Sequence, residues 1–247
     1  MSAGFKDHFS ERAPAYASYR PHYPAELAAW LADVAPARDM AWDAACGSGQ
    51  LSTLLGDRFE RVVATDASAA QIGQAVAHAH VEYRVEPAET TSFADRSLDL
   101  ITVAQAAHWL SLNAFYKEVR RVARPRAVIA LIAYGRTHID PRVDSIVEAF
   151  YAGDLDPWWP PERKHIETEY RDLDFPFDRI EAPAFDMQAF WTADQLIGYV
   201  RTWSAVRAME SANGPMATER FAESIHNAWG NEARLVRWPV VIKAGQL

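Results

Sequence analysis

The chain has 247 residues, of which 49% are hydrophobic and 23% charged, and this suits one large α/β domain with its own core. A formal net charge of -8 without a basic block argues against a nucleic-acid partner, because such binding depends on clustered Lys and Arg. The single cysteine excludes an intrachain disulfide and a multi-cysteine metal site. With neither a signal-peptide core nor a membrane-length apolar run, we expect a cytoplasmic protein with no membrane partner and no metal.

Residues 1–36 predict an N-terminal cap followed by a helix. The segment 5–24 is rich in aromatic residues, with Arg20 and two prolines near its end. Such a segment either covers a site as a flap or caps the edge of a sheet, and both interpretations stay open. Apolar residues at positions 27, 30, 31 and 34 then have the spacing of a helix that packs on a sheet.

The stretch 42–50, Trp-Asp-Ala-Ala-Cys-Gly-Ser-Gly-Gln, predicts a strand, a tight turn and the start of a helix. Glycine has no Cβ, so it adopts unusual backbone angles and lets a ligand lie directly against the main chain. The helix that follows turns its free N–H groups toward such a ligand. Gly-x-Gly alone is a weak signal, and the surrounding residues must decide which ligand binds.

An acidic residue follows the second predicted strand, residues 61–65. Asp66 stands at the carboxyl end of that strand, where a carboxylate accepts hydrogen bonds from ribose hydroxyls in doubly wound folds. The alternative is a helix N-cap for the segment that starts near Ser68. A dinucleotide-binding motif requires a third glycine, but Ser52 occupies that position, which weakens a nicotinamide-cofactor interpretation.

The spacing of Asp43, Ala45, Gly47 and Gly49 resembles motif I of the class I methyltransferases, which bind S-adenosylmethionine. The resemblance implies that Asp43 faces the charged amino end of the methionine moiety, a group that a nicotinamide dinucleotide lacks. Ala45 stands in place of the first glycine of the motif. Among the residues that follow the second strand, Ala67 joins Asp66 as a candidate cofactor contact.

Residues 67–79 are alanine-rich and predict a helix with Ile72 and Val76 turned inward, and residues 81–85 predict a third strand. Ala88 and Glu89 follow that strand. They resemble the methyltransferase motif in which a small residue and an acid border the adenine ring, so that Glu89 accepts from the exocyclic amine. The alternative is a solvent-exposed loop glutamate.

Residues 97–104 are nearly all apolar, as in a strand buried on both faces, and lead into Gln105-Ala-Ala-His-Trp109. This sequence resembles a hallmark of small-molecule methyltransferases similar to trans-aconitate methyltransferase. The resemblance places Gln105 with the cofactor. It makes His108 the candidate catalytic and substrate-contacting residue, which orients the nucleophile or takes its proton, with a purely structural histidine as the alternative. Trp109 is expected to form part of the substrate wall.

The same resemblance extends to residues 9–24, where it implies that Tyr19 and Arg20 close over the methionine end of the cofactor. Arg20 would pair with the cofactor carboxylate. With Arg136, Arg163 and Arg201, Arg20 is also a candidate clamp for an anionic acceptor.

The second half of the chain predicts a helix over 115–122, a strand over 127–134 and an irregular insertion over 135–180. Trp158 and Trp159 either form the substrate-facing apolar side of that lid or fill its own small core. Further predictions are a strand over 185–191, a helix over 192–208, a helix over 218–229 and a strand over 237–243.

Taken together, the sequence predicts one Rossmann-like α/β domain, 1–247, with a doubly wound seven-stranded sheet and helices on both faces. The sheet is mostly parallel with an antiparallel last strand. Its parts are the cap and first helix (1–36), the cofactor-binding core (37–134), the lid insertion (135–180) and the last helices and strands (181–247).

We expect methyl transfer from S-adenosylmethionine to a small-molecule acceptor, a carboxylate or another oxygen nucleophile. The protein would act as a monomer or homodimer. An NAD-dependent oxidoreductase and a non-catalytic ligand-binding protein are the alternatives.

Overall fold

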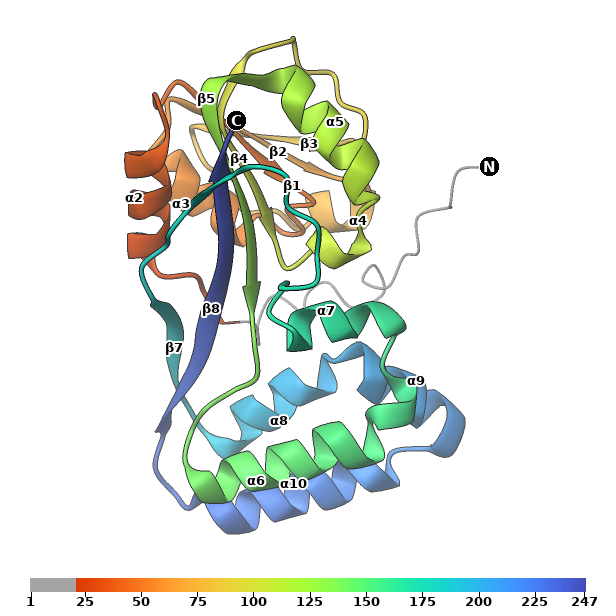
Figure 1. Cartoon of the computed structure of the whole chain (residues 1–247). Helices are drawn as coiled ribbons and strands as arrows, with labels where there is room; N and C mark the ends of the chain where they lie inside the picture. The colour runs from red at the N-terminus through yellow and green to blue at the C-terminus, as the bar shows by residue number, and fades with distance from the viewer. Residues whose placement is uncertain (1–20) are drawn as a thin grey trace.

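Five parallel strands form the centre of the sheet in the computed structural model, which describes residues 21–247 (Figure 1). The sheet order is β3-β2-β1-β4-β5-β8-β6, and β7 also pairs with β8. The strands are β1 (Met40–Ala44), β2 (Arg61–Asp66), β3 (Val81–Val85), β4 (Leu98–Ala104), β5 (Ala123–Tyr134), β6 (Asp178–Ile180), β7 (Phe185–Trp191) and β8 (Arg234–Gln246).

The long strand β8 lies antiparallel beside β5, which confirms the predicted mixed sheet with an antiparallel last strand. Along its other edge, β8 pairs with β7 at residues 234–240 and with β6 at residues 244–246. The two short strands therefore share one edge position. β6 has only three residues, too few for an alternating pattern, so the sequence predicts seven strands and not eight.

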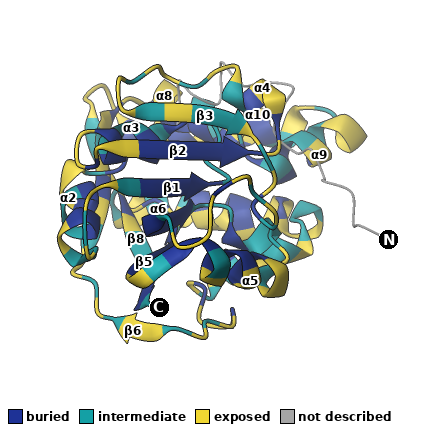
Figure 2. Cartoon of the chain, turned by 90° about the horizontal axis from the view of Figure 1, so that it is seen from above, coloured by how far each residue is buried: buried dark blue, intermediate teal, exposed yellow. Residues whose placement is uncertain are grey.

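Alternate side chains of the central strands point to opposite faces of the sheet and pack into two separate apolar cores. On one face, residues of β1, β2, β4 and β5 pack with α2 (Ala25–Val34) and α3 (Gln50–Gly56). On the other face, Trp42, Ile101 and Leu131 pack with α5 (Leu112–Val122). Figure 2 shows β1 and β2 almost entirely buried and β3 more exposed at the sheet edge. Helices on both faces confirm the predicted doubly wound class.

A second group of helices lies beyond the carboxyl ends of the central strands (Figure 1). It combines parts of the predicted insertion with the late helices: α6 and α10 contact each other, and the rings of Phe150 and Phe221 stack with centroids 4.5 Å apart. These elements are α6 (Pro141–Ala149), η3 (Phe150–Asp154), η4 (Asp156–Trp158), η5 (Pro161–Arg163), α7 (Lys164–Glu167), α8 (Ala193–Arg201), α9 (Ser204–Asn213) and α10 (Met216–Trp229).

Two helix predictions are wrong in their extent. The helix predicted over 67–79 is only α4 (Ala69–Ile72), and Val76, expected inside, is 64% exposed. Gly73 ends this helix, and the alanines that follow offer little apolar area for packing. The helix predicted over 192–208 is broken into α8 and α9, with the buried Trp203 in extended backbone between them.

The strand order reverses between β1 and β4, so the carboxyl ends of these neighbours form a topological switch point, where open α/β sheets bind ligands. Within residues 21–247, no helix is long and apolar enough to cross a membrane. The same residues contain no group of three or more His, Cys, Asp or Glu side chains that could hold a metal ion.

Candidate functional site at the switch point

The turn between β1 and α3 has three residues in the left-handed backbone region: Ala45 (φ 51°), Gly47 (φ 57°) and Gly49 (φ 80°). Glycine adopts this conformation without cost, whereas Ala45, at the first glycine position of the motif, adopts it with some strain. There is also no space for a side chain at position 49, because a Cβ atom there would lie 2.3 Å from the hydroxyl of Tyr83. The turn therefore requires glycine at position 49 for two independent reasons.

Asp66 shapes this turn from the end of β2. The N–H of Gly47 donates to Asp66 Oδ2 at 2.9 Å, and the N–H of Ser68 donates to Asp66 Oδ1 at 2.8 Å. Asp66 is 8% exposed, and Ala67 follows it directly. The N-cap residue of α4 is Ser68, whose side chain accepts from Gln71, so Asp66 is not the helix cap itself. A ribose contact by Asp66 stays a prediction.

Asp43 lies under the turn and is 1% exposed. The hydroxyl of Ser52 donates to Asp43 Oδ2 at 2.6 Å, and that of Thr102 donates to Oδ1 at 2.8 Å. Burial raises the pKa of Asp43 to about 6, although both hydroxyls lower it and Asp66 raises it further. Ser52 and Thr102 are both neutral donors, and Ser52 has this role at the position where a dinucleotide motif has its third glycine.

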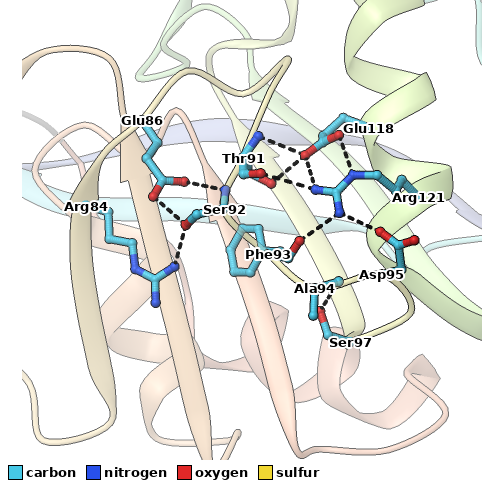
Figure 3. Close-up of polar contacts among 10 residues, drawn as sticks. All are labelled: Arg84, Glu86, Thr91, Ser92, Phe93, Ala94, Asp95, Ser97, Glu118 and Arg121. Carbon is cyan, nitrogen blue, oxygen red and sulfur yellow. Dashed lines mark hydrogen bonds and ion pairs between the residues drawn. The ribbon is translucent and has the colours of Figure 1, made fainter.

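The loop after β3 is held in place by a polar network (Figure 3). The side chain of Ser92 donates to Glu86 at 2.6 Å, and the backbone and hydroxyl of Thr91 both donate to Glu118 of α5. Arg121 pairs with Glu118 and donates to two backbone carbonyls of the loop. This pairing lowers the pKa of Glu118 to about 2, so Glu118 is ionised at neutral pH.

Ala88 and Glu89 occupy this anchored loop. Ala88 is buried, and Glu89 accepts a hydrogen bond from the backbone N–H of Ser111 at 3.0 Å. The glutamate thus has a defined partner at the start of α5 and is not a free loop side chain. Contact with adenine by either residue stays a prediction.

At the end of β4 the chain turns sharply at Gln105, which has φ 55°. Its backbone N–H donates to Ile132, and its side-chain amide donates to the carbonyl of Tyr134 at 3.2 Å. The side-chain oxygen of Gln105 is buried and accepts no hydrogen bond from the described residues. This acceptor lies one residue beyond β4, at the switch point.

His108 lies in the short helix η2 (Ala107–Trp109) and is held by a residue far away in the sequence. Its Nδ1 is 3.0 Å from the hydroxyl of Tyr170, 62 residues later, and its ring lies beside Trp109 with centroids 4.8 Å apart. Burial, with smaller effects of Arg163 and His165, lowers the pKa of His108 to about 3. His108 is therefore a neutral imidazole at physiological pH.

Tyr170 is the residue of this site that the sequence does not predict. It is fully buried, has φ 57°, and its pKa is raised by burial, with a smaller opposing effect of hydrogen bonding from the backbone of Ala107 and His108. A phenol in that environment keeps its proton and can donate it to His108 Nδ1, an arrangement that would leave the imidazole proton on Nε2. No local motif marks Tyr170, since its role depends on the packing of residues 166–173 against the sheet.

The two predicted lid tryptophans pack within the helical layer. Trp159 lies between Tyr151 and Trp203, with ring centroids 4.7 and 5.7 Å away, and its Nε1 donates to the carbonyl of Tyr151. Trp158 is partly buried against the same core. Both residues therefore contribute to that core, and their contact with a substrate stays a prediction. Tyr19 and Arg20 lie outside the described residues.

Comparison with known proteins agrees with this geometry. A family model described as a methyltransferase domain matches residues 42–131, which span the turn, Asp66, Glu89 and His108. A protein of Dictyostelium discoideum that carries the name methyltransferase is 32% identical over 229 residues, which cover 91% of this chain and 87% of that protein. The chain therefore belongs to the class I S-adenosylmethionine-dependent methyltransferases and is an enzyme.

Two further relatives are also named as methyltransferases. The solved structure of a protein from Anaeromyxobacter dehalogenans, assigned to the type II methyltransferases, is 46% identical with a TM-score of 0.87. The match covers 92% of this chain and 98% of that one. An uncharacterized methyltransferase of Mycobacterium tuberculosis is 35% identical over 127 residues, about half of each chain. These names do not specify an acceptor.

Replacement of Gly49 by Ala is expected to lower the free energy of unfolding by about 1–3 kcal/mol, because the new Cβ meets Tyr83 in a backbone conformation unfavourable to alanine. Gly153→Ala is the matched control, since a Cβ there meets no atom within 4 Å and φ is ordinary. Denaturant unfolding of both variants measures the difference. Equal midpoints for Gly49→Ala and the wild type would contradict the account of the turn.

His108 is expected to remain neutral, with its proton on Nε2, throughout the range from about pH 5 to 8. Because its folded pKa lies below the unfolded value of 6.5, this group contributes stability that is lost as pH falls below about 6.5. Nitrogen NMR of the imidazole reports both the charge and the tautomer. Tyr170→Phe should shift the Nδ1 resonance selectively. A protonated ring at pH 6, or a proton on Nδ1, would refute this assignment.

Proposed function

We propose that this enzyme transfers a methyl group from S-adenosylmethionine to the carboxylate, or another oxygen nucleophile, of a small molecule bound beside His108. The observation that carries the proposal is the common position of the glycine turn, Asp66 and His108. They follow the carboxyl ends of β1, β2 and β4, which are neighbours in the sheet. A ligand lying across the switch point would contact all three.

The residues present suit the cofactor along its whole length. Asp66, with Ala67 beside it, would bind the ribose hydroxyls, and the anchored loop with Ala88 and Glu89 would border the adenine. Gly47 and Gly49 let the methionine portion lie against the backbone, and the family resemblance adds Tyr19 and Arg20 over that end. The unused oxygen of Gln105 offers an acceptor to the cofactor.

Asp43 supports the choice of a cationic ligand. Its carboxylate is buried and, among residues 21–247, accepts hydrogen bonds only from the hydroxyl groups of Ser52 and Thr102, so burial makes its charged form costly. An ammonium group against the turn would supply the opposite charge at short range. The α-amino group of S-adenosylmethionine is such a cation, and nicotinamide dinucleotides have no ammonium to place there.

The state of His108 favours an acceptor that needs no general base. A histidine with a pKa of about 3 is a weak proton acceptor at neutral pH, but its Nε2–H can donate a hydrogen bond that orients an oxygen. A carboxylate has no proton to lose: its oxygen lone pair bonds to the methyl carbon while the electron pair of the carbon–sulfur bond returns to sulfur. The bound cofactor supplies the electrophilic methyl group.

The surrounding side chains would then position the acceptor and exclude water. Trp109 lies directly beside His108 and provides an apolar wall. We expect Trp158 and Trp159, which pack in the core of the helical layer, to extend that wall. In this proposal the chain contributes orientation and shielding rather than acid–base chemistry.

Calorimetric titration with S-adenosylhomocysteine tests the cofactor site. We expect micromolar binding to the wild type, weakened by about tenfold or more in Asp66→Ala, since a charge-assisted hydrogen bond contributes about 1.5–3 kcal/mol. Asp186→Ala removes a carboxylate from the exposed side of β7 and should bind as the wild type does. Thermal melts of all variants check folding.

Two results of this titration would reject the proposal. One is the absence of S-adenosylhomocysteine binding to the folded wild type together with binding of NADH, which would favour an oxidoreductase. The other is unchanged affinity in Asp66→Ala, which would place the ligand elsewhere.

A further inference from the structure

A half-buried arginine faces the same region as His108 from the helical layer. Arg163 ends η5, and η5 contacts η2, which carries His108. Burial lowers the pKa of His108 and the positive charge of Arg163 lowers it further, whereas burial raises the pKa of Tyr170 and Arg163 partly opposes that rise. Arg163 thus belongs to the element that packs against η2, which carries the imidazole at which we place the acceptor.

Aromatic side chains hold this guanidinium in a defined orientation. Its central carbon lies 4.9 Å from the ring centroid of Trp159 and 5.6 Å from that of Tyr151. Arg163 Nε donates to the hydroxyl of Tyr151 at 2.9 Å, and this hydroxyl in turn donates to Glu167 at 2.7 Å. The carboxylate of Glu167 therefore accepts from the hydroxyl of Tyr151 and does not contact the guanidinium of Arg163 directly. Neither Nη group donates a hydrogen bond to residues 21–247, so both are able to bind another acceptor.

No ion pair joins Arg163 to a carboxylate of residues 21–247. A guanidinium that is half removed from water without an anionic partner is costly, and a planar anion would relieve that cost. The other arginines considered as clamps do not share this position: Arg136 pairs with Glu148, and Arg201 is exposed. Arg20 is not among the described residues.

We infer that Arg163 binds an anionic group of the acceptor, with its two Nη groups directed at a carboxylate or a similar planar anion beside His108. This inference rests on the proposed function and adds the chemical class of the acceptor: a small acid. Arg163 is the residue that would select it over uncharged molecules of the same shape.

The bound anion is distinct from the oxygen that receives the methyl group. A carboxylate loses its negative charge on methylation, so an arginine paired with that group would stabilise the ground state more than the transition state. Two Nη hydrogen bonds would also occupy the lone pairs that the reaction needs. The acceptor should therefore carry one anionic group for Arg163 and a separate nucleophilic oxygen for His108.

Paired acids and amides test this inference on protein saturated with S-adenosylhomocysteine. Phenylacetate, succinate and glutarate are each compared with their carboxamides by quenching of tryptophan fluorescence. We expect at least one acid to bind about tenfold more tightly than its amide, because the uncharged amide cannot form the charge-assisted hydrogen bond with Arg163. Arg163→Gln should reduce this preference to less than about twofold and leave S-adenosylhomocysteine binding unchanged.

Two further variants make the experiment decisive. Arg201→Gln, at the exposed end of α8, should keep the full preference for acids. Arg163→Lys keeps the charge but loses the planar fork, and an intermediate preference is expected even if Arg163→Gln folds poorly.

Equal binding of acids and amides to the wild type would overturn the inference, as would an unchanged preference in Arg163→Gln. Failure of every acid to bind at about 10 mM, with S-adenosylhomocysteine bound, would also overturn the inference. That result would not contradict the proposed cofactor site. Failure of S-adenosylhomocysteine itself to bind would instead refute the proposed function. Acid binding to the cofactor-free protein then reports on Arg163 separately.

Discussion

Two buried aspartates, one at the end of β2 and one on β1, determine the shape of the turn on which the site depends. Asp66 accepts from the backbone of Gly47 and Ser68 and so joins the turn to the start of α4. Asp43 binds Ser52 of α3 and Thr102 of β4. Three neighbouring strands and two helices are thereby fixed around one short backbone segment. Because both carboxylates are buried, their negative charge is concentrated at the switch point.

The proposed acceptor end of the site depends on a different constraint, the packing of the helical layer against the sheet. Tyr170 lies in the core below α5 and hydrogen-bonds His108, while Arg163 is held by Tyr151 and Trp159. In the proposed site, the parallel strands would hold the cofactor and residues 150–170 would hold the acceptor. Such a division would allow related methyltransferases to act on different acceptors, since the helical layer can vary in sequence without change to the glycine turn.

Much of the cofactor side could be predicted from the sequence because its signals are local. Asp43, Gly47, Gly49 and Asp66 follow one another at the spacing of a strand, a turn, a helix and a second strand. The apolar runs of β4 and β5 indicate central strands for the same reason. The antiparallel β8 is confirmed as well, at a position that the family resemblance implies.

The errors and omissions arise where tertiary packing decides the structure. Alanine-rich residues 67–79 have helical propensity, but Gly73 and the lack of large apolar side chains end α4 after Ile72. Trp203 has extended backbone between α8 and α9 and so divides the predicted helix 192–208, and its buried ring packs against Tyr151, Trp159 and Tyr199. The pairing of His108 with Tyr170 spans 62 residues and leaves no periodic signal. These contacts become visible only in the folded chain.

The pH dependence of S-adenosylhomocysteine binding tests most directly whether the cofactor amino group meets the buried charge of Asp43. With a pKa of about 6, Asp43 is protonated in part of the free protein at acid pH, and a cationic ligand favours its ionised form. Affinity should therefore increase from about pH 5 to 7, with a proton released on binding near pH 6, and Asp43→Asn should abolish the increase. The asparagine amide can still bond to Ser52 and Thr102, so the fold is retained. An affinity that is constant or falls over this range, or the same slope in Asp43→Asn, would contradict the account.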